Sequence, residues 1–170
     1  MDISRIKPEF VDGELGIKLG REQAPTKLIE FLNLRCPYCR QWFDESNGLL
    51  QPLTENGSLL RVIKLFNKNK ESLQSGNLMH RYVPSASEQA YQVIEKLFNS
   101  QTDWGNLSLT EVSNFAEDEL GLKQVENAGM LERIGTEAQA ANIETVPTIM
   151  VGEHIFDQHI SNKQLKQIIS

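Results

Sequence analysis

Two apolar segments that read as buried strands lie on either side of a segment that reads as a helix, and this order restricts the fold. Residues Leu28–Leu34 are mostly apolar, and residues Leu59–Phe66 form a second apolar run. Pro37 suits the first turn of a helix between them, because its missing N–H is not needed there. A strand, a helix and a second strand in this order predict a βαβ unit with a parallel strand pair.

The predicted helix contains two residues that disfavour helical structure. We expect Gly48 and Pro52 to interrupt it, and Gly57 to end the segment. Before the βαβ unit, residues 10–19 contain two short apolar stretches that indicate an edge strand or a hairpin.

Helical periodicity continues through the middle of the chain, and strand patterns return near its end. Residues 67–142 contain several amphipathic segments, including one expected at about 123–141, and cannot be a loop in a compact domain. Residues 147–157 predict a β-hairpin turning at Gly152, and Ser161 caps a last helix. The order predicts an α/β thioredoxin-like fold in one domain (residues 1–170). Its helical insertion (about 67–142) separates the βαβ half from the C-terminal hairpin–helix half.

The only two cysteines, Cys36 and Cys39, lie two residues apart where the first strand meets the helix. Unpaired N–H groups and the positive end of the helix dipole favour a thiolate at Cys36, and Arg35 adds a neighbouring positive charge. Both effects lower the pKa of the Cys36 thiol. We therefore assign Cys36 as the nucleophile and Cys39, one helical turn later, as the resolving thiol.

Two other interpretations of the cysteine pair remain open, an inert buried pair and half of a metal site. A tetrahedral zinc site needs two more ligands. The three histidines have no ligand-like spacing relative to the pair, so we expect no metal; they are His80, His154 and His159.

Glu30 interrupts the first apolar strand six residues before Cys36. A carboxylate inside a buried strand is costly unless it is paired or protonated. Glu30 is therefore a candidate to exchange a proton with Cys39 while a mixed disulfide is resolved. The alternative is a glutamate that reaches solvent from the end of the strand.

Residues Thr145–Thr148 precede the predicted hairpin. A proline is tolerated as the first residue of a strand. If the Val146–Pro147 bond is cis, the backbone of Val146 can pair with an extended substrate beside the cysteines. From the residues alone, an ordinary trans strand entry is the simpler interpretation.

These features together resemble the DsbA-like thiol–disulfide oxidoreductases of the thioredoxin superfamily. The resemblance rests on the Cys36-Pro37-Tyr38-Cys39 motif, Glu30, the helical insertion and the late Val146-Pro147-Thr148. It implies a cis bond before Pro147, an exposed nucleophile at Cys36 and a buried proton-transfer group at Glu30. It also implies substrate contacts by Pro37, Tyr38, Thr145, Val146 and Pro147.

One departure concerns the residue between the cysteines. The strongly oxidising members have histidine where this chain has Tyr38, so we expect a less oxidising pair. The motif and Thr145-Val146-Pro147 also resemble glutaredoxins, whose Thr-Val backbone holds glutathione. Those domains are about half as long, and residues 158–161 lack the Gly-Gly pair that they usually carry.

Composition narrows the functional classes. The net charge of −6 argues against a nucleic-acid partner, and two cysteines in 170 residues cannot form a disulfide scaffold. The N-terminus has no apolar core of signal-peptide length, and no segment approaches a membrane span, so we expect a cytoplasmic protein without a membrane partner. We also expect a monomer.

The leading hypothesis is a protein-disulfide oxidoreductase without a cofactor, acting as a reductase or in redox homeostasis. It exchanges disulfides with protein or peptide substrates and takes electrons from a thiol or dithiol donor. The first alternative is a glutaredoxin-like reductase dependent on a low-molecular-weight thiol. The second is a redox-inactive module that binds peptide or metal.

Overall fold

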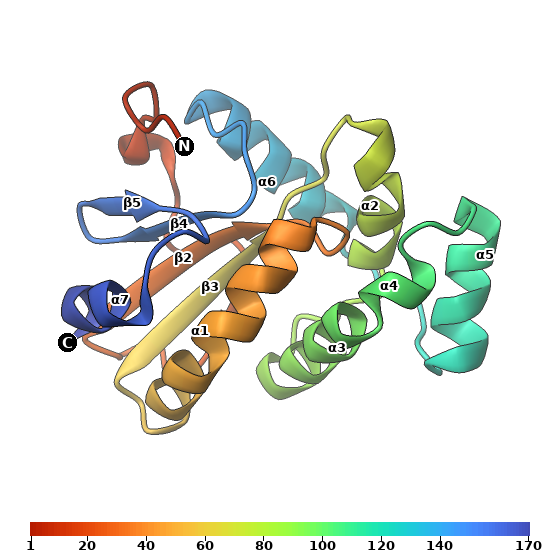
Figure 1. Cartoon of the computed structure of the whole chain (residues 1–170), viewed down its shortest axis with the longest axis horizontal. Helices are drawn as coiled ribbons and strands as arrows, with labels where there is room; N and C mark the ends of the chain where they lie inside the picture. The colour runs from red at the N-terminus through yellow and green to blue at the C-terminus, as the bar shows by residue number, and fades with distance from the viewer.

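The computed structural model describes residues 1–170 and has a central five-stranded sheet with helices on both faces (Figure 1). The strand order is β1-β3-β2-β4-β5; β2 and β3 are parallel, and all other pairs are antiparallel. This arrangement confirms the thioredoxin-like fold. The strands are β1 (Ile17–Leu19), β2 (Thr26–Leu32), β3 (Leu59–Leu65), β4 (Thr148–Val151) and β5 (His154–Phe156).

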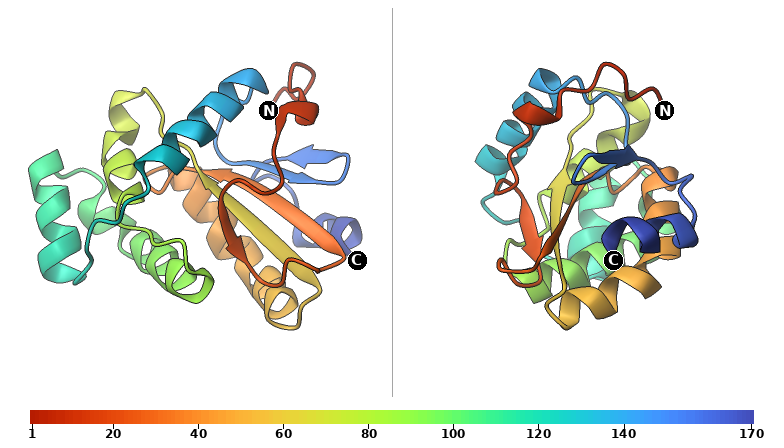
Figure 2. Two further views of the ribbon diagram at one scale, coloured as in Figure 1. Left: turned by 180° about the vertical axis from the view of Figure 1, so that it is seen from behind. Right: turned by 90° about the vertical axis from the view of Figure 1, so that its left-hand side faces the viewer.

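The two faces of the sheet carry different helices. Helices α1, α3 and α7 cover the front face, while α6 and the N-terminal segment cover the back (Figures 1 and 2). Helices α2, α4 and α5 lie beyond one end of the sheet, where α1 begins. None of the helices is long and apolar enough to cross a membrane. The helices are α1 (Pro37–Glu55), α2 (Gln74–His80), α3 (Ser87–Asn99), α4 (Gln101–Trp104), α5 (Leu109–Asn114), α6 (Ala128–Ala140) and α7 (Asn162–Ile169).

The predicted interruption of the first helix is wrong, because α1 continues through Gly48 and Pro52 to Glu55. A proline inside a helix removes the hydrogen bond to the carbonyl four residues earlier, here that of Gly48. Both residues are exposed, so this carbonyl can be hydrated, and Pro52 lies in the last turn, where little helix remains to be disturbed.

The insertion consists of five helices, α2 to α6, in agreement with the several amphipathic segments expected there. Ser108 and Glu111 form a reciprocal capping box at the start of α5, and Gly121 adopts a positive φ of 66° after the π-helical turn Phe115–Glu119. Helix α6 begins only at Ala128, later than expected. The preceding segment instead bonds to the end of α2, through Val125 N–H and the Asn127 side chain.

A buried ion pair attaches α6 and the N-terminal segment to the back of the sheet. Lys64 of β3 is fully buried, and its Nζ lies 2.8 Å from Glu137 Oε1. The same ammonium donates to the backbone carbonyls of Asp12 and Leu15, at 2.6 and 2.5 Å. Burial lowers the pKa of Lys64, while Glu137 acts against that shift.

Glu137→Gln is expected to lower the free energy of unfolding by about 3 kcal/mol, because it leaves the buried ammonium without its counter-ion. Chemical denaturation measures this, with the exposed Glu132→Gln on the same helix as the control. The double variant Lys64→Met/Glu137→Leu should lose less free energy of unfolding than Lys64→Met and Glu137→Leu lose in sum. Equal stability of Glu137→Gln and Glu132→Gln would contradict the assignment.

Candidate active site

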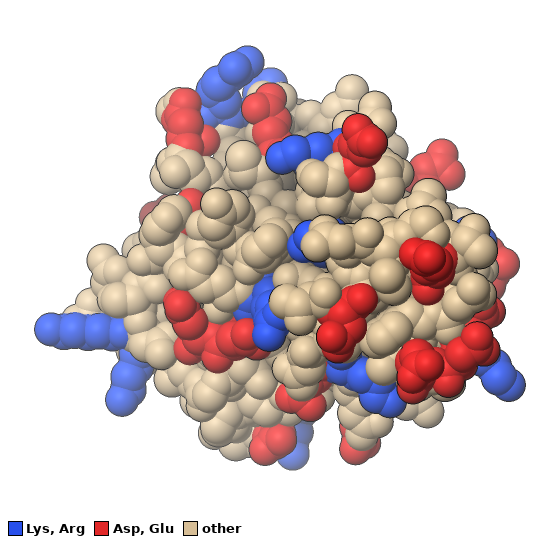
Figure 3. Space-filling model, turned by 45° about the vertical axis from the view of Figure 1, so that its right-hand side comes forward, with Lys and Arg blue, Asp and Glu red and all other residues tan.

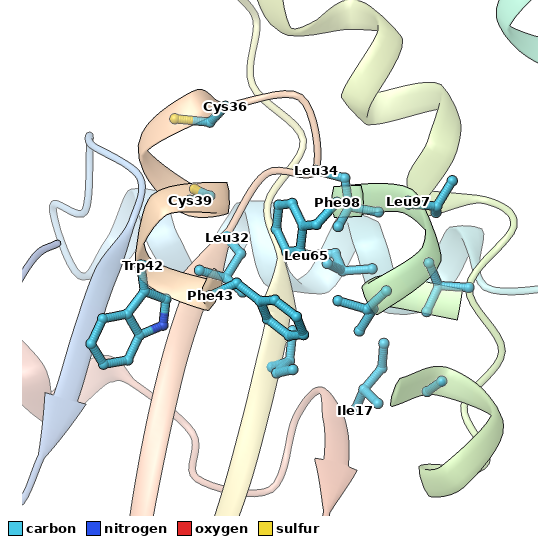
Figure 4. Packing of buried hydrophobic residues seen from close by; sticks show 14 of the residues in the cluster. Ile17, Leu32, Leu34, Cys36, Cys39, Trp42, Phe43, Leu65, Leu97 and Phe98 are labelled. Atoms are coloured by element: carbon cyan, nitrogen blue, oxygen red, sulfur yellow. The ribbon is translucent and has the colours of Figure 1, made fainter. Parts of the chain in front are cut away.

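The two cysteines occupy the first turn of α1 at the end of β2. Cys36 is the N-cap of the helix and Cys39 lies one turn inside it, as expected (Figure 4). Both are free thiols; Cys36 is 5% exposed and Cys39 is fully buried. Cys36 is thus less exposed than the resemblance implied, because it packs beside Val146, whose carbonyl oxygen lies 3.6 Å from its sulfur.

The pKa values of the two thiols shift in opposite directions. A hydrogen bond from Cys39, assisted by the backbone N–H groups of Cys39 and Tyr38, lowers the pKa of Cys36 to about 6 despite partial burial. Burial raises the pKa of Cys39 well above its ordinary value. At neutral pH, Cys36 is therefore mainly a thiolate and Cys39 a thiol, which is the division that a nucleophile and a resolving thiol would require.

The cation near Cys36 is Lys70 rather than Arg35. The Arg35 guanidinium turns away and donates to the Gly105 carbonyl at 2.8 Å and to Asn106 Oδ1 at 3.0 Å. Lys70 lies in the loop after β3 and contributes to the lowered pKa of Cys36. The expectation for Arg35 is wrong because neighbours in sequence need not point the same way at a helix start.

A cleft of about 780 Å³ brings most of the expected site residues together. Cys36, Pro37 and Tyr38 line it from α1, and Thr145, Val146 and Pro147 line it from the segment before β4. The Val146–Pro147 peptide bond is cis. Tyr38 is 58% exposed, so its ring is available to a substrate. Cys39 and Glu30 do not reach this cleft.

Glu30 lies under α1 with partners that the sequence analysis did not identify. Its carboxylate accepts two hydrogen bonds from Arg61, at 2.9 and 2.8 Å, and one from Trp42 Nε1 at 2.8 Å. Leu28 pairs with Arg61 in the β2–β3 register, so Glu30, two residues later, faces the same side. The cations Arg61 and Lys64 in the neighbouring apolar strand β3 were a usable signal that Glu30 has a charged partner there.

Side chains from the insertion hold the backbone of the loop before Cys36. His80 of α2 accepts the Leu34 N–H through Nε2 at 3.1 Å, and its Nδ1 lies 2.6 Å from Asn67 Oδ1. Gln101 donates to the carbonyls of Leu34 and Cys36, at 2.7 and 3.2 Å. No sequence pattern indicated these contacts, because His80 and Gln101 are far from the cysteines along the chain.

The helix α2 approaches this loop closely. A Cβ at Gly76 would lie 2.0 Å from Asn33 Oδ1 and 2.7 Å from the Arg35 nitrogen. Asn33 in turn accepts the Arg35 N–H and donates to the carbonyl of Phe66, while its own N–H lies 3.4 Å from Cys39 Sγ. A side chain at position 76 would therefore displace the loop that precedes the two cysteines.

The alkylation rate of Cys36 should rise with pH through a midpoint near 6, because only the thiolate reacts. Cys39→Ala removes the principal hydrogen-bond donor and should move the midpoint upward, whereas Cys39→Ser keeps a donor and should move it less. Mass spectrometry after timed alkylation measures both. An unchanged midpoint in Cys39→Ala would show that Cys39 does not set the acidity of Cys36.

His80 should make the stability of the fold sensitive to acid. Burial lowers its pKa from 6.5 to about 3, so the unfolded chain takes up a proton that the folded chain refuses. The free energy of unfolding is expected to fall as the pH drops from about 6.5 towards 3, by about 1.4 kcal/mol per pH unit from this group. His80→Gln should reduce that slope in denaturation curves between pH 4 and 7. The exposed His154→Gln should retain it, and equal slopes in the two variants would refute the prediction.

Comparison with known proteins agrees with the thioredoxin-like fold. The family model described as Thioredoxin matches residues 13–170. A conserved protein of unknown function from Enterococcus faecalis V583 is 49% identical, with a TM-score of 0.97 over 99% of this chain and 97% of its own. No match was found among the curated proteins.

More distant solved structures share the fold. The catalytic domain of Proteus mirabilis ScsC has 17% identity and a TM-score of 0.70, covering 95% of this chain and 91% of its own. Oxidised BdbD from Bacillus subtilis has 15% identity and a TM-score of 0.64, covering 97% and 94%. The chain therefore belongs to the thioredoxin family.

Proposed function

We propose that the protein is a thiol–disulfide oxidoreductase that reduces disulfides of protein substrates in the cytosol. The observation that carries this proposal is the opposed shift of two thiol pKa values in one helical turn beside an open cleft. A nucleophile at the cleft that is mainly thiolate at neutral pH and a protonated thiol beneath it are what two-step disulfide exchange needs.

The reaction proceeds in two exchanges. The Cys36 thiolate attacks one sulfur of the substrate disulfide and forms a mixed disulfide, while the other substrate sulfur leaves as a thiolate and takes up a proton. Cys39 then loses its proton and attacks Cys36, and the second substrate sulfur leaves. The substrate gains two electrons, the protein gains a Cys36–Cys39 disulfide, and an external dithiol restores the reduced pair.

Several residues have defined parts in this scheme. The carbonyl of Val146, beside Cys36, is positioned to accept a backbone N–H of an extended substrate. Tyr38 offers its exposed ring to the same chain. Glu30 remains the proposed acceptor of the Cys39 proton, with Arg61 and Trp42 fixing its carboxylate.

The acidity of Cys36 favours the reducing direction. Strong oxidants of this superfamily have a nucleophile pKa of about 3.5, and thioredoxin has one of about 7. The value of about 6 for Cys36 is nearer to thioredoxin. A less acidic nucleophile stabilises the reduced form less, so the disulfide is a weaker oxidant.

The reduction potential of the pair, equilibrated against glutathione buffers and read by alkylation, is expected near the thioredoxin value of about −270 mV. The protein should then reduce insulin with a dithiol donor, and Cys36→Ser should abolish this activity. A potential near about −120 mV would contradict the reductase assignment. No dithiol–disulfide transition would exclude the enzyme and favour a peptide- or metal-binding module.

The activity of the Cys39→Ser variant distinguishes the glutaredoxin-like alternative from the proposed dithiol reductase. A monothiol route needs only Cys36, so activity that requires glutathione and survives Cys39→Ser would support that alternative. Loss of insulin reduction in Cys39→Ser supports the dithiol route instead.

A further inference from the structure

The cleft beside Cys36 has one wall that bears positive charge. Residues Lys68, Lys70 and Ser72, from the segment that links β3 to α2, line this wall. The opposite wall is the Glu144–Pro147 segment, so a substrate bound against Val146 also faces the two lysines.

The two lysines differ in whether their ammonium groups have partners within the protein. The Lys68 ammonium donates to the Glu144 carbonyl across the cleft and lies 4.7 Å from the centre of the Phe66 ring. Lys70 is exposed and takes part in none of the ion pairs of the structure. Its backbone is held, because its carbonyl accepts the Leu73 N–H at 2.9 Å and the Gln74 side chain at 3.2 Å. Lys70 thus combines an ammonium group that forms no ion pair with a backbone that is held in place.

The carboxylates of the cleft do not neutralise Lys70. Glu144 acts electrostatically on Lys68, and Asp157 accepts hydrogen bonds from the backbone and ring of His159. The chain as a whole has a net charge of −6, and Figure 3 shows several groups of acidic side chains on one face. The cleft beside the reactive sulfur therefore has an unpaired positive charge, although the molecule as a whole is negatively charged.

We propose that this cleft selects disulfides flanked by a carboxylate, which Lys70 binds while Cys36 attacks the sulfur. The inference rests on the proposed function and names its substrate class. The carboxylate can belong to an acidic residue next to the cysteine of a peptide, or to a small thiol such as glutathione. Lys70 supplies a charge that orients the disulfide, and it takes no part in the bond changes.

The test compares rates for peptides that differ only in the residues flanking one cysteine, which carries a 2-thiopyridyl disulfide. The Cys36 thiolate displaces the thiopyridyl sulfur, and absorbance follows its release. The Glu-flanked peptide should react about two- to fivefold faster than the Gln-flanked peptide at low salt, the size of one exposed charge pair. The Lys-flanked peptide should react more slowly than the Gln-flanked one, and added salt should reduce both differences.

Variants assign the preference to Lys70. Lys70→Gln should bring the Glu/Gln rate ratio to about one, and Lys70→Glu should favour the Lys-flanked peptide. The ratio cancels any change in the acidity of Cys36, which both peptides share. Lys96→Gln on α3 is the matched control, because Lys96 is exposed and outside the cleft. A Glu/Gln ratio of one in the unmodified protein, or a ratio unchanged in Lys70→Gln, would overturn the proposal.

A second arm identifies the source of the carboxylate. Oxidised glutathione is compared with the ester that masks its glycine carboxylates, in the unmodified protein and in Lys70→Gln. A Lys70-dependent preference only among peptides supports acidic protein substrates, and one only for glutathione supports a small thiol. Reaction with the Gln-flanked peptide but no charge preference refutes this inference alone. No reaction with any of the disulfides refutes the proposed function itself.

Discussion

The buried backbone of the loop that joins β2 to α1 is the constraint on which the active site depends. Its N–H and C=O groups are removed from water and must find partners inside the protein. His80 and Gln101 supply them from α2 and α4, so the insertion holds the cysteines as well as enlarging the domain. The same contacts require a neutral His80, which burial ensures by lowering its pKa to about 3.

Once the loop is fixed, burial separates the chemistry of the two thiols. Cys36 borders the cleft at the start of the helix, where N–H groups and the Cys39 thiol stabilise its anion. Cys39 is enclosed by protein, where an anion is costly. The difference in reactivity thus comes from the hydrogen bonds that stabilise the Cys36 anion and from the burial that disfavours an anion at Cys39.

The parts of the fold that were predictable are those encoded by short-range patterns. Apolar runs located β2 and β3, and the Gly152 turn and the Ser161 cap located the C-terminal hairpin and α7. The effect of Pro52 was not predictable, because the cost of a helical proline depends on whether the freed carbonyl reaches water. The delayed start of α6 likewise followed from bonds between Asn127 and the end of α2.

The sequence by itself determined the chemistry that is available. It places two cysteines one turn apart at a helix start, and it places Pro147 at the start of the C-terminal hairpin. The tertiary structure decided which charges act on that chemistry. It turned Arg35 away, brought Lys70 beside Cys36 and paired Glu30 with Arg61. Electrostatic effects depend on distance and burial rather than on separation along the chain, and only the packed molecule defines both.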